Sequence, residues 1–258
     1  MAETWKTAVT SIAPNEIRVR GIRIDEMMGR VSFGEAVYLI LRGELPGAAV
    51  GRVMEAMLVA SIDHGVTPPS ALAVRNAATT GAPLNACLAA GALAVNRHHG
   101  GAVEDCMRLL ARGAATIATG TPPADAAKAL IAEEKAAGRR LPGWGHRVHT
   151  DDPRSGRLLG LVKEAGTAGP HITVAEAIAA ELARGGKVLP LNVDGAIAAV
   201  LADLGFRPEL ANGFFILART AGWMAHVAEE VAREKPMRRI DQAAAEYDGP
   251  APRSLPTP

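Results

Sequence analysis

Aromatic residues are scarce in this sequence, at 3% of 258 residues, whereas alanine is abundant. A core that is poor in rings and rich in Ala, Leu and Val is typical of closely packed helices. Apolar residues make up 48% of the chain and charged residues 21%, which excludes a disordered protein. We therefore expect a folded, all-α protein that is long enough to bury a real core.

Charge of one sign, long apolar runs and a leader segment are also missing. The formal net charge is +1 and no basic stripe stands out, so nucleic acid is not expected as a partner. No segment reaches the ~20 uninterrupted apolar residues of a membrane span, so no membrane is expected as a partner. The opening residues, MAETWKTAVT, lack the apolar stretch of a signal peptide. These absences predict a cytoplasmic protein.

Metal and nucleotide motifs are absent from the sequence. The two cysteines, Cys87 and Cys106, have no metal-like spacing and are interpreted as buried thiols. There is no HExxH or CxxC, and the adjacent His98 and His99 would diverge on a helix. No GxGxxG follows a strand and no P-loop lysine is present, so nucleotide-dependent chemistry has no support. We predict no metal site and no permanently bound cofactor.

A short β-rich start precedes the helical part of the chain. The alternation of Ile17, Val19, Ile22 and Ile24 around Gly21 predicts a hairpin. The helical periods and the breakers between them then predict a series of helices. The first begins after Ser32, with Glu35 completing a capping box, and a later one begins at Thr173, with Glu176 completing a second capping box. The others are expected to begin near residue 51, after Pro69, from Gly100, at Thr121–Pro123 with a stop at Gly138, at Asp194, and at residue 212 with an end at residue 233. The proline-rich tail from Asp248 is expected to be an extended arm.

Three histidines lie in loops beside glycine or proline. His64 precedes a double proline, His99 is followed by two glycines, and His146 lies in a Gly- and Pro-rich segment. Backbone N–H groups at helix starts suit anionic ligands, and glycine lets a ligand approach the backbone. Asp194 begins another helix, where a carboxylate is commonly no more than an N-cap. Each residue alone has such a structural interpretation, but several of these loops together favour a shared site.

Five motifs, in this order, resemble the citrate synthase superfamily. They are DHG at 63–65, HHGGA at 98–102, LPGWGHRV at 141–148 with DPR at 152–154, LNVDG at 191–195 and LARTAGWMAH at 217–226. The resemblance spans most of the chain. It implies one citrate-synthase-like helical fold over residues 1–258, with a large domain at 1–115 and 212–258 and a small lobe at 116–211.

The resemblance also implies roles for individual residues. His99 would hydrogen-bond the thioester oxygen of an enol, His146 would exchange a proton with the keto oxygen of oxaloacetate, and Asp194 would transfer the proton at the methyl carbon of acetyl-CoA. Substrate carboxylates would be held by His64, Arg154 and Arg219. The adenine of coenzyme A would meet the loop of Leu141, Pro142, Gly143, Trp144 and Gly145. Such a set fits enolate chemistry, which needs a donor at the oxygen and an acid or base at the carbon. A coenzyme A thioester is then expected as a substrate.

Within the superfamily, the layout resembles the citryl-CoA lyases, including the C-terminal module of ATP-citrate lyase. His64 arrives after only two helices and a hairpin, whereas citrate synthases are longer. The implied reaction is cleavage of citryl-CoA to acetyl-CoA and oxaloacetate through an enol. One departure concerns the Arg-Pro pair with which citrate synthases clamp a substrate carboxylate in the partner subunit. Its position falls on Gln242 and Ala243, before Tyr247, so Arg238 or Arg239 is the candidate replacement.

Other functions stay open at this stage. They are a short citrate synthase or 2-methylcitrate synthase that condenses an acyl-CoA with oxaloacetate, a non-catalytic subunit of an acyl-CoA complex, and a plain helical scaffold. The superfamily's members are dimers or larger, so a homodimer or higher homo-oligomer is implied. The Ala- and Gly-rich helices between residues 71 and 95 suit packing between subunits, with ordinary core packing as the alternative.

Overall fold

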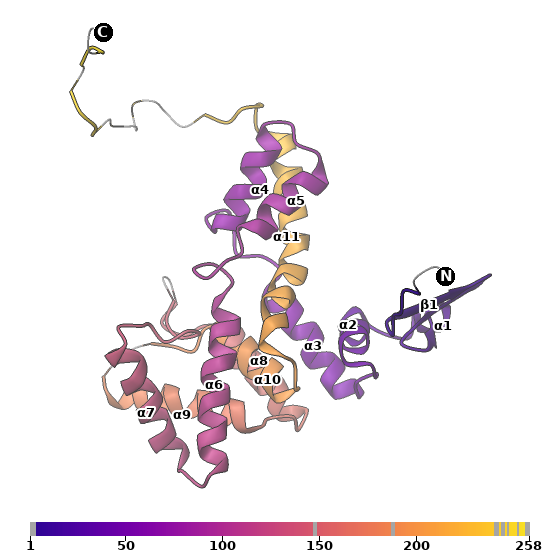
Figure 1. Ribbon diagram of the computed structural model, residues 1–258, viewed down its shortest axis with the longest axis vertical. Helices are drawn as coiled ribbons and strands as arrows, with labels where there is room; N and C mark the ends of the chain where they lie inside the picture. The colour runs from indigo at the N-terminus through magenta and orange to yellow at the C-terminus, as the bar shows by residue number, and fades with distance from the viewer. Residues whose placement is uncertain are drawn as a thin grey trace.

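The computed structural model describes residues 4–146, 149–186 and 189–239, together with 243, 246, 248–251 and 253–255. Within these residues the chain forms eleven α-helices, one short 3-10 helix and a small antiparallel sheet near the N-terminus (Figure 1). The prediction of an all-α fold with a short N-terminal hairpin is therefore confirmed.

The N-terminal sheet has three strands in the order β1-β2-β3. They are β1 (Thr10–Ala13), β2 (Glu16–Val19) and β3 (Ile22–Arg23), and the short helix α1 (Ile24–Met27) follows directly. Val19 pairs with Ile22 across the turn that contains Gly21, as predicted. Strand β1 was not predicted, because its residues are mostly exposed and lack an apolar alternation. It was wrong to extend the second strand to Ile24, which begins α1.

The remaining elements are helical and follow one another with short connections. They are α2 (Phe33–Arg42), α3 (Ala48–Ala60), α4 (Pro69–Thr79), α5 (Leu84–Leu93), α6 (Ala102–Ala118), α7 (Pro123–Ala136), α8 (Pro153–Glu164), α9 (Pro170–Arg184), α10 (Val193–Asp203), η1 (Pro208–Leu210) and α11 (Ala211–Arg233).

Local capping explains several helix ends. Ser32 and Glu35 form the predicted capping box at the start of α2. The second predicted capping box is wrong, because α9 begins at Pro170 and the Thr173 hydroxyl instead donates to the Gly169 carbonyl. The buried carboxylate of Asp203, at the end of α10, takes the capping role by accepting the backbone N–H groups of Gly169, His171 and Ile172. A residue from a later helix therefore fixes where α9 starts.

Two clusters of buried side chains hold the helices together. The larger cluster joins α2, α3 and α6 to α10 with the beginning of α11. The smaller cluster joins α4, α5 and the rest of α11 through Val74, Ala78, Cys87, Trp223 and Val227. Figure 1 shows these three helices as a separate lobe, with the long α11 running into both parts. Cys87 and Cys106 are both buried, as predicted. The division into domains at residues 115 and 211 stays a prediction.

The chain beyond α11 is tied back onto the lobe of α4, α5 and α11. Arg238 forms a two-pronged ion pair with the buried Glu230, at 2.8 and 2.6 Å, and its backbone N–H donates to Thr79. Arg238 is thus engaged within its own chain, whereas Gln242 and Tyr247 lie outside the described residues. None of the helices in the described part of the chain is long and apolar enough to span a membrane.

Candidate active site

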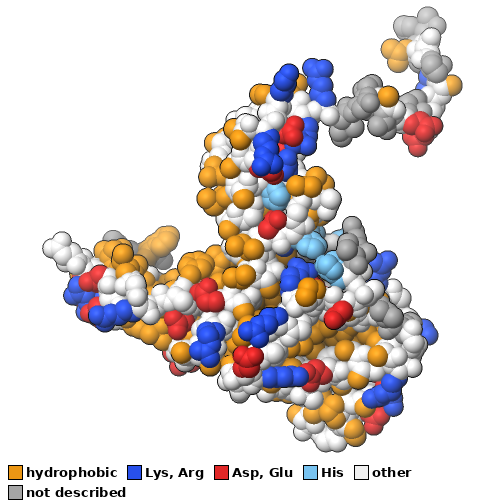
Figure 2. Space-filling view, turned by 180° about the vertical axis from the view of Figure 1, so that it is seen from behind, with side chains coloured by type: hydrophobic (Ala, Val, Ile, Leu, Met, Phe, Trp, Pro, Cys, Tyr) orange, Lys and Arg blue, Asp and Glu red, His pale blue; other side chains and the backbone are white. Residues whose placement is uncertain are grey.

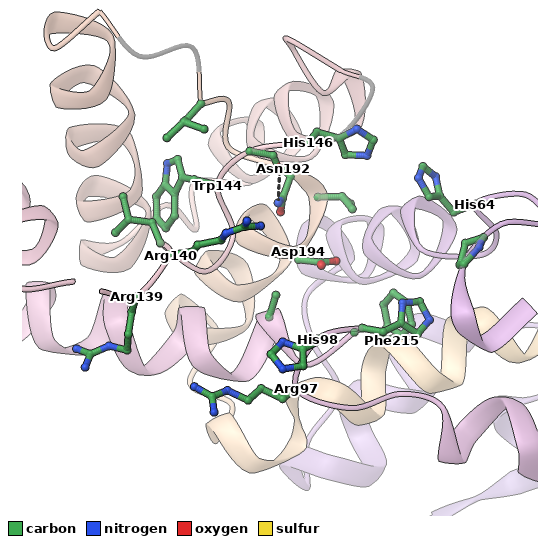
Figure 3. Close-up of a pocket in the computed structure, with 18 of the residues that line it drawn as sticks. His64, Arg97, His98, Arg139, Arg140, Trp144, His146, Asn192, Asp194 and Phe215 are labelled. Atoms are coloured by element: carbon green, nitrogen blue, oxygen red, sulfur yellow. Dashed lines mark hydrogen bonds between the residues drawn. The ribbon is translucent and has the colours of Figure 1, made fainter. Parts of the chain in front are cut away.

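A cleft of about 980 Å³ lies where the lobe of α4, α5 and α11 meets the rest of the molecule. Figure 2 shows histidine side chains at this junction, next to Lys and Arg side chains. Nine of the eleven residues predicted for the site line the cleft, namely His64, His99, Leu141, Trp144, Gly145, His146, Arg154, Asp194 and Arg219. Figure 3 labels His64, Trp144, His146 and Asp194 among them. Pro142 and Gly143 do not line it.

Two loops are paired along one wall of the cleft. The Gly145 N–H donates to the Pro190 carbonyl at 2.8 Å, and the Asn192 N–H donates to the Gly143 carbonyl at 2.9 Å. The Asn192 amide also donates to the Gly145 carbonyl at 2.8 Å, which is the dashed line in Figure 3. Gly143 has a φ of +85°, and a Cβ there would lie 2.7 Å from the Gly195 Cα. Gly143 is thus required for the close approach of two backbones, which brings the loop of His146 against the start of α10.

Asp194 lies in the first turn of α10 but does not cap it. Asn192 is the N-cap, and its side-chain oxygen accepts the Gly195 N–H at 3.1 Å. The interpretation of Asp194 as an N-cap is therefore wrong, and its carboxylate is left to face the cleft. Burial raises the pKa of Asp194, and the nearby guanidinium groups of Arg154 and Arg219 oppose this shift.

A second carboxylate, that of Asp152, is buried beneath the cleft wall, with 1% of its surface exposed. It accepts Nε and Nη2 of Arg154, at 2.9 and 2.8 Å, and the backbone N–H of Val193 at 3.1 Å. Burial pushes the pKa of Asp152 upward, but these donors hold it below its usual value. Because Val193 is the first residue of α10, Asp152 fixes both the Arg154 side chain and the helix start that carries Asp194.

His99 is held from two sides. Its Nε2 lies 2.8 Å from the hydroxyl of Ser70, which is fully buried in the first turn of α4. Its ring also forms a T-shaped pair with the ring of Phe215, with 5.8 Å between the ring centroids. Burial lowers the pKa of His99, and the charge of Arg219 adds to the shift. The imidazole is thereby kept neutral, with Nδ1 left for a ligand.

His64 and His146 face each other across the cleft, edge to face, with 5.5 Å between their ring centroids (Figure 3). A third imidazole, that of His149, lies against His146 at 4.4 Å and a tilt of 31°. The His149 backbone N–H donates to Nδ1 of His146 at 3.0 Å. Burial, followed by the charge of His149, lowers the pKa of His146. Burial, followed by the charge of Arg154, lowers the pKa of His64.

Helix α11 anchors the loop of His64. Arg219 is buried, donates through Nε to the Ser61 carbonyl at 2.7 Å, and lies over the Phe215 ring at 4.5 Å. Seven residues later, His226 lies 3.0 Å from the carboxylate of Asp63. This spacing corresponds to two helical turns, so Arg219 and His226 lie on one face of α11, and the DHG motif owes its position to that face.

Several residues of the site were not predicted. Ser70, Asp152, Asn192 and His149 act on predicted residues. Asp152 and Asn192 had a sequence signal, because both lie within quoted motifs and are residue types favoured at helix N-caps, whereas Ser70 and His149 had none. A basic group also lines the cleft, and it consists of Arg97, Lys135, Arg139 and Arg140. Among the described residues, no group of three or more His, Cys, Asp or Glu side chains is placed to hold a metal ion.

Comparison with known proteins gives consistent matches. The family model for citrate synthase, C-terminal domain, matches residues 46–240. The chain is similar to the solved citryl-CoA lyase of Hydrogenobacter thermophilus, with 44% identity and a TM-score of 0.89 over 98% of both chains. An ATP citrate lyase of Methanosaeta concilii in complex with (3S)-citryl-CoA shares the fold, with a TM-score of 0.82 at 21% identity over 97% of this chain and 42% of that one.

Curated relatives are longer than this chain. The 2-methylcitrate synthase of Shewanella oneidensis is 28% identical over 244 residues, which correspond to 91% of this chain and 60% of the relative. The chain spans between 52% and 60% of the length of the curated relatives that it matches.

Proposed function

The chain belongs to the citrate synthase family, and on this basis we propose that it is a citryl-CoA lyase, which cleaves citryl-CoA to acetyl-CoA and oxaloacetate. The observation that carries the proposal is the 44% identity to a citryl-CoA lyase over 98% of both chains. The convergence of His99, His146 and Asp194 on one cleft supports it independently of that likeness.

His99 would stabilise the enol that forms when the carbon–carbon bond breaks. Because Nε2 faces the Ser70 hydroxyl, Nδ1 is the nitrogen that can donate to the thioester oxygen. A neutral imidazole whose donor is already oriented stabilises the developing charge without reorganising. The low pKa of His99 keeps the ring in that neutral form.

Asp194 and His146 have pKa values that move toward each other. Burial raises the pKa of Asp194 and lowers that of His146. Both shifts increase the fraction of molecules in which Asp194 carries a proton while His146 does not. Cleavage needs this combination, because His146 must take the hydroxyl proton of citryl-CoA and Asp194 must deliver a proton to the enol carbon. The same residues serve both directions of the reaction, and these two shifts favour the protonation states with which cleavage begins.

The other lining residues suit the two ends of the substrate. His64, Arg154 and Arg219 would hold the carboxylates of the citryl group. Figure 3 shows Arg139 and Arg140 on the side of Asp194 away from His64, where they would meet the phosphates of coenzyme A. Trp144 lies beside them, and its buried indole N–H finds no acceptor in the described part of the chain, so a bound adenine could supply one. Coenzyme A would then be bound as part of the substrate.

An assay with both substrate sets tests the proposal. The purified chain is given synthetic citryl-CoA, and oxaloacetate is followed by coupled NADH consumption with malate dehydrogenase. In parallel it is given acetyl-CoA and oxaloacetate with a thiol reagent. We expect oxaloacetate release from citryl-CoA, and a small residual rate with His146→Ala. Release of free coenzyme A in the second assay would instead indicate a citrate synthase. Failure to turn over or bind either thioester would indicate a non-catalytic subunit.

We also propose that the lobe of α4, α5 and α11 joins two copies of the chain. Large hydrophobic side chains are exposed on all three helices, namely Leu72, Leu84, Leu93, Met224 and Val231. Figure 2 shows hydrophobic atoms spread over this lobe. Some of the small residues of α5 serve packing within the chain, because a Cβ at Gly91 would lie 2.6 Å from Val74 and 2.9 Å from Trp223. The exposed hydrophobic side chains of these helices would be buried against a second copy of the chain.

Sedimentation experiments test the dimer. Wild-type chain is expected to sediment as a dimer or larger, and the double variant Leu93→Lys with Val231→Lys as a monomer. Val59→Lys, at a side chain on α3 that is 62% exposed, is the control and should leave the assembly unchanged. A monomeric wild type would overturn the proposal.

A further inference from the structure

The His146 ring is held in two ways by the same neighbour. The backbone N–H of His149 donates to Nδ1 of His146 at 3.0 Å. The His149 ring also lies against the His146 ring, with 4.4 Å between centroids and a tilt of 31°. His149 is half-buried and is not among the residues that line the cleft, whereas His146, which it contacts, does line it.

The two contacts respond differently to the movement of a proton. The N–H contact exists only while Nδ1 is unprotonated, which puts the proton of the neutral ring on Nε2. Taking the hydroxyl proton of citryl-CoA at Nε2 requires that the ring proton be on Nδ1 instead, and the N–H contact then opens. A contact between ring faces does not depend on which nitrogen carries the proton. The contact with the His149 ring can therefore persist through the whole proton exchange, whereas the contact with its backbone N–H cannot.

We propose that His149 is a positioning residue for the proposed cleavage reaction, and that its ring keeps the imidazole of His146 oriented while His146 exchanges its proton. The inference rests on the proposed function for the identity of the reaction, and on the two contacts between His149 and His146 for the role of the residue.

The effect of the His149 side chain on the pKa of His146 can be measured through the pH dependence of the reaction. Among the described residues, the ionisable groups near His146 include His64 from the loop before α4, His149 from its own loop, and Asp152 and Arg154 from the start of α8. After burial, His149 is the largest influence that lowers the pKa of His146, while Asp152 acts in the opposite direction. Replacing His149 by phenylalanine keeps a ring in place and removes its charge, so the pKa of His146 should rise.

Two substitutions separate the ring from its charge. His149→Ala removes the ring and keeps the backbone N–H. We expect kcat to fall by about tenfold or more while KM changes little, because a misplaced acid–base group weakens stabilisation of the transition state and leaves substrate binding intact. His149→Phe should keep most of kcat near neutral pH, and the acid limb of its kcat/KM profile should move to higher pH. Thr150→Ala, at the exposed next residue, is the matched control and should behave as wild type.

The double variant tests whether His149 acts through His146. In a His146→Ala background, His149→Ala should cause no further loss, because the ring that it positions is gone. Unchanged kcat in His149→Ala, or an equal loss in both single variants with circular dichroism and melting unchanged, would overturn the inference. A further tenfold loss in the double variant would also overturn it.

A measurement without turnover keeps the inference separate from the proposed function. With ¹³C-labelled histidine, the His146 signal is identified by its absence in His146→Ala, and its titration is compared in wild type and His149→Phe. A titration at higher pH in His149→Phe supports the inference, and an identical titration overturns it. If wild type fails to cleave citryl-CoA, the proposed function fails while this comparison still decides the role of His149.

Discussion

The hydroxyl of Ser70 lies 2.8 Å from Nε2 of His99, although 28 residues and most of two helices separate them in sequence. Ser70 is fully buried in the first turn of α4, so its hydroxyl has few alternative orientations. The pairing leaves the other ring nitrogen for the substrate and fixes which nitrogen donates.

Removing this hydroxyl should impair turnover more than binding. Ser70→Ala leaves Nε2 of His99 without its partner, so the ring can adopt the wrong tautomer or turn. We expect kcat for citryl-CoA cleavage to fall by about 10- to 100-fold, as for other residues that orient a catalytic group, with a smaller change in KM. Steady-state kinetics measure this. Ser32→Ala, which removes the N-cap of α2, is the control: it should cost about 1 kcal/mol of stability and leave kcat intact. Equal kinetic effects of the two substitutions would contradict the role of Ser70.

Replacing Asp194 should separate activity from stability. Asp194→Asn removes the proton donor, so turnover should fall by about 10²- to 10⁴-fold. The folded-state pKa of Asp194 is raised by burial, so the native protein loses stability as pH rises from the unfolded pKa to the folded one. The neutral amide avoids that loss, and the melting temperature at neutral pH should stay level or rise. Calorimetry checks this, with the exposed Asp125→Asn as the control. A large drop in melting temperature would show that the carboxylate is structural.

The pH profile of cleavage should fall on both sides. On the alkaline side kcat/KM should decrease as Asp194 ionises, because the enol then receives no proton. On the acid side it should decrease as His146 becomes protonated and can no longer take the hydroxyl proton. Profiles of citryl-CoA cleavage between about pH 5 and pH 9 measure both limbs. A cleavage rate that increases with pH through the Asp194 transition would assign Asp194 the opposite role, that of a base.

The capping of α9 by Asp203 predicts a defined loss of stability in acid. Burial pushes the pKa of Asp203 upward, but the hydrogen bonds from His171 and from three backbone N–H groups outweigh it and hold the pKa below its usual value. The carboxylate therefore contributes stability above its unfolded pKa, and this is lost as pH falls through the folded pKa. Asp203→Asn should lower the free energy of unfolding by about 1–3 kcal/mol near neutral pH. Urea unfolding at several pH values tests this, and a variant that loses as much stability in acid as wild type does would contradict it.

The sequence was sufficient for features that depend on neighbouring residues. The capping box of Ser32 and Glu35 predicted α2, and the apolar period after residue 212 predicted α11 to within one residue. The true start of α9 depends on Asp203, more than thirty residues later, and no local pattern could reveal it. The motifs predicted most of the cleft because each fixes one loop.

The contacts that support those motifs were beyond the sequence for the same reason. Ser70 and Asp152 reach residues on other elements, so their partners became visible only when the chain was folded. Pro142 and Gly143 belong to a predicted motif but do not line the cleft. Gly143 is needed instead for the close approach of its loop to Gly195.

The contact between Gly143 and Gly195 has a consequence for motion and for divergence. With no side chain between the two backbones, neither loop has room to slide or tilt without carrying the other along. His146 and Asp194 are thus attached to one rigid unit formed by the two loops, and any opening of the cleft must displace both residues together. In homologous sequences the side chains that line the cleft can change one at a time, but a methyl group at Gly143 or Gly195 would push the two loops apart and separate His146 from Asp194.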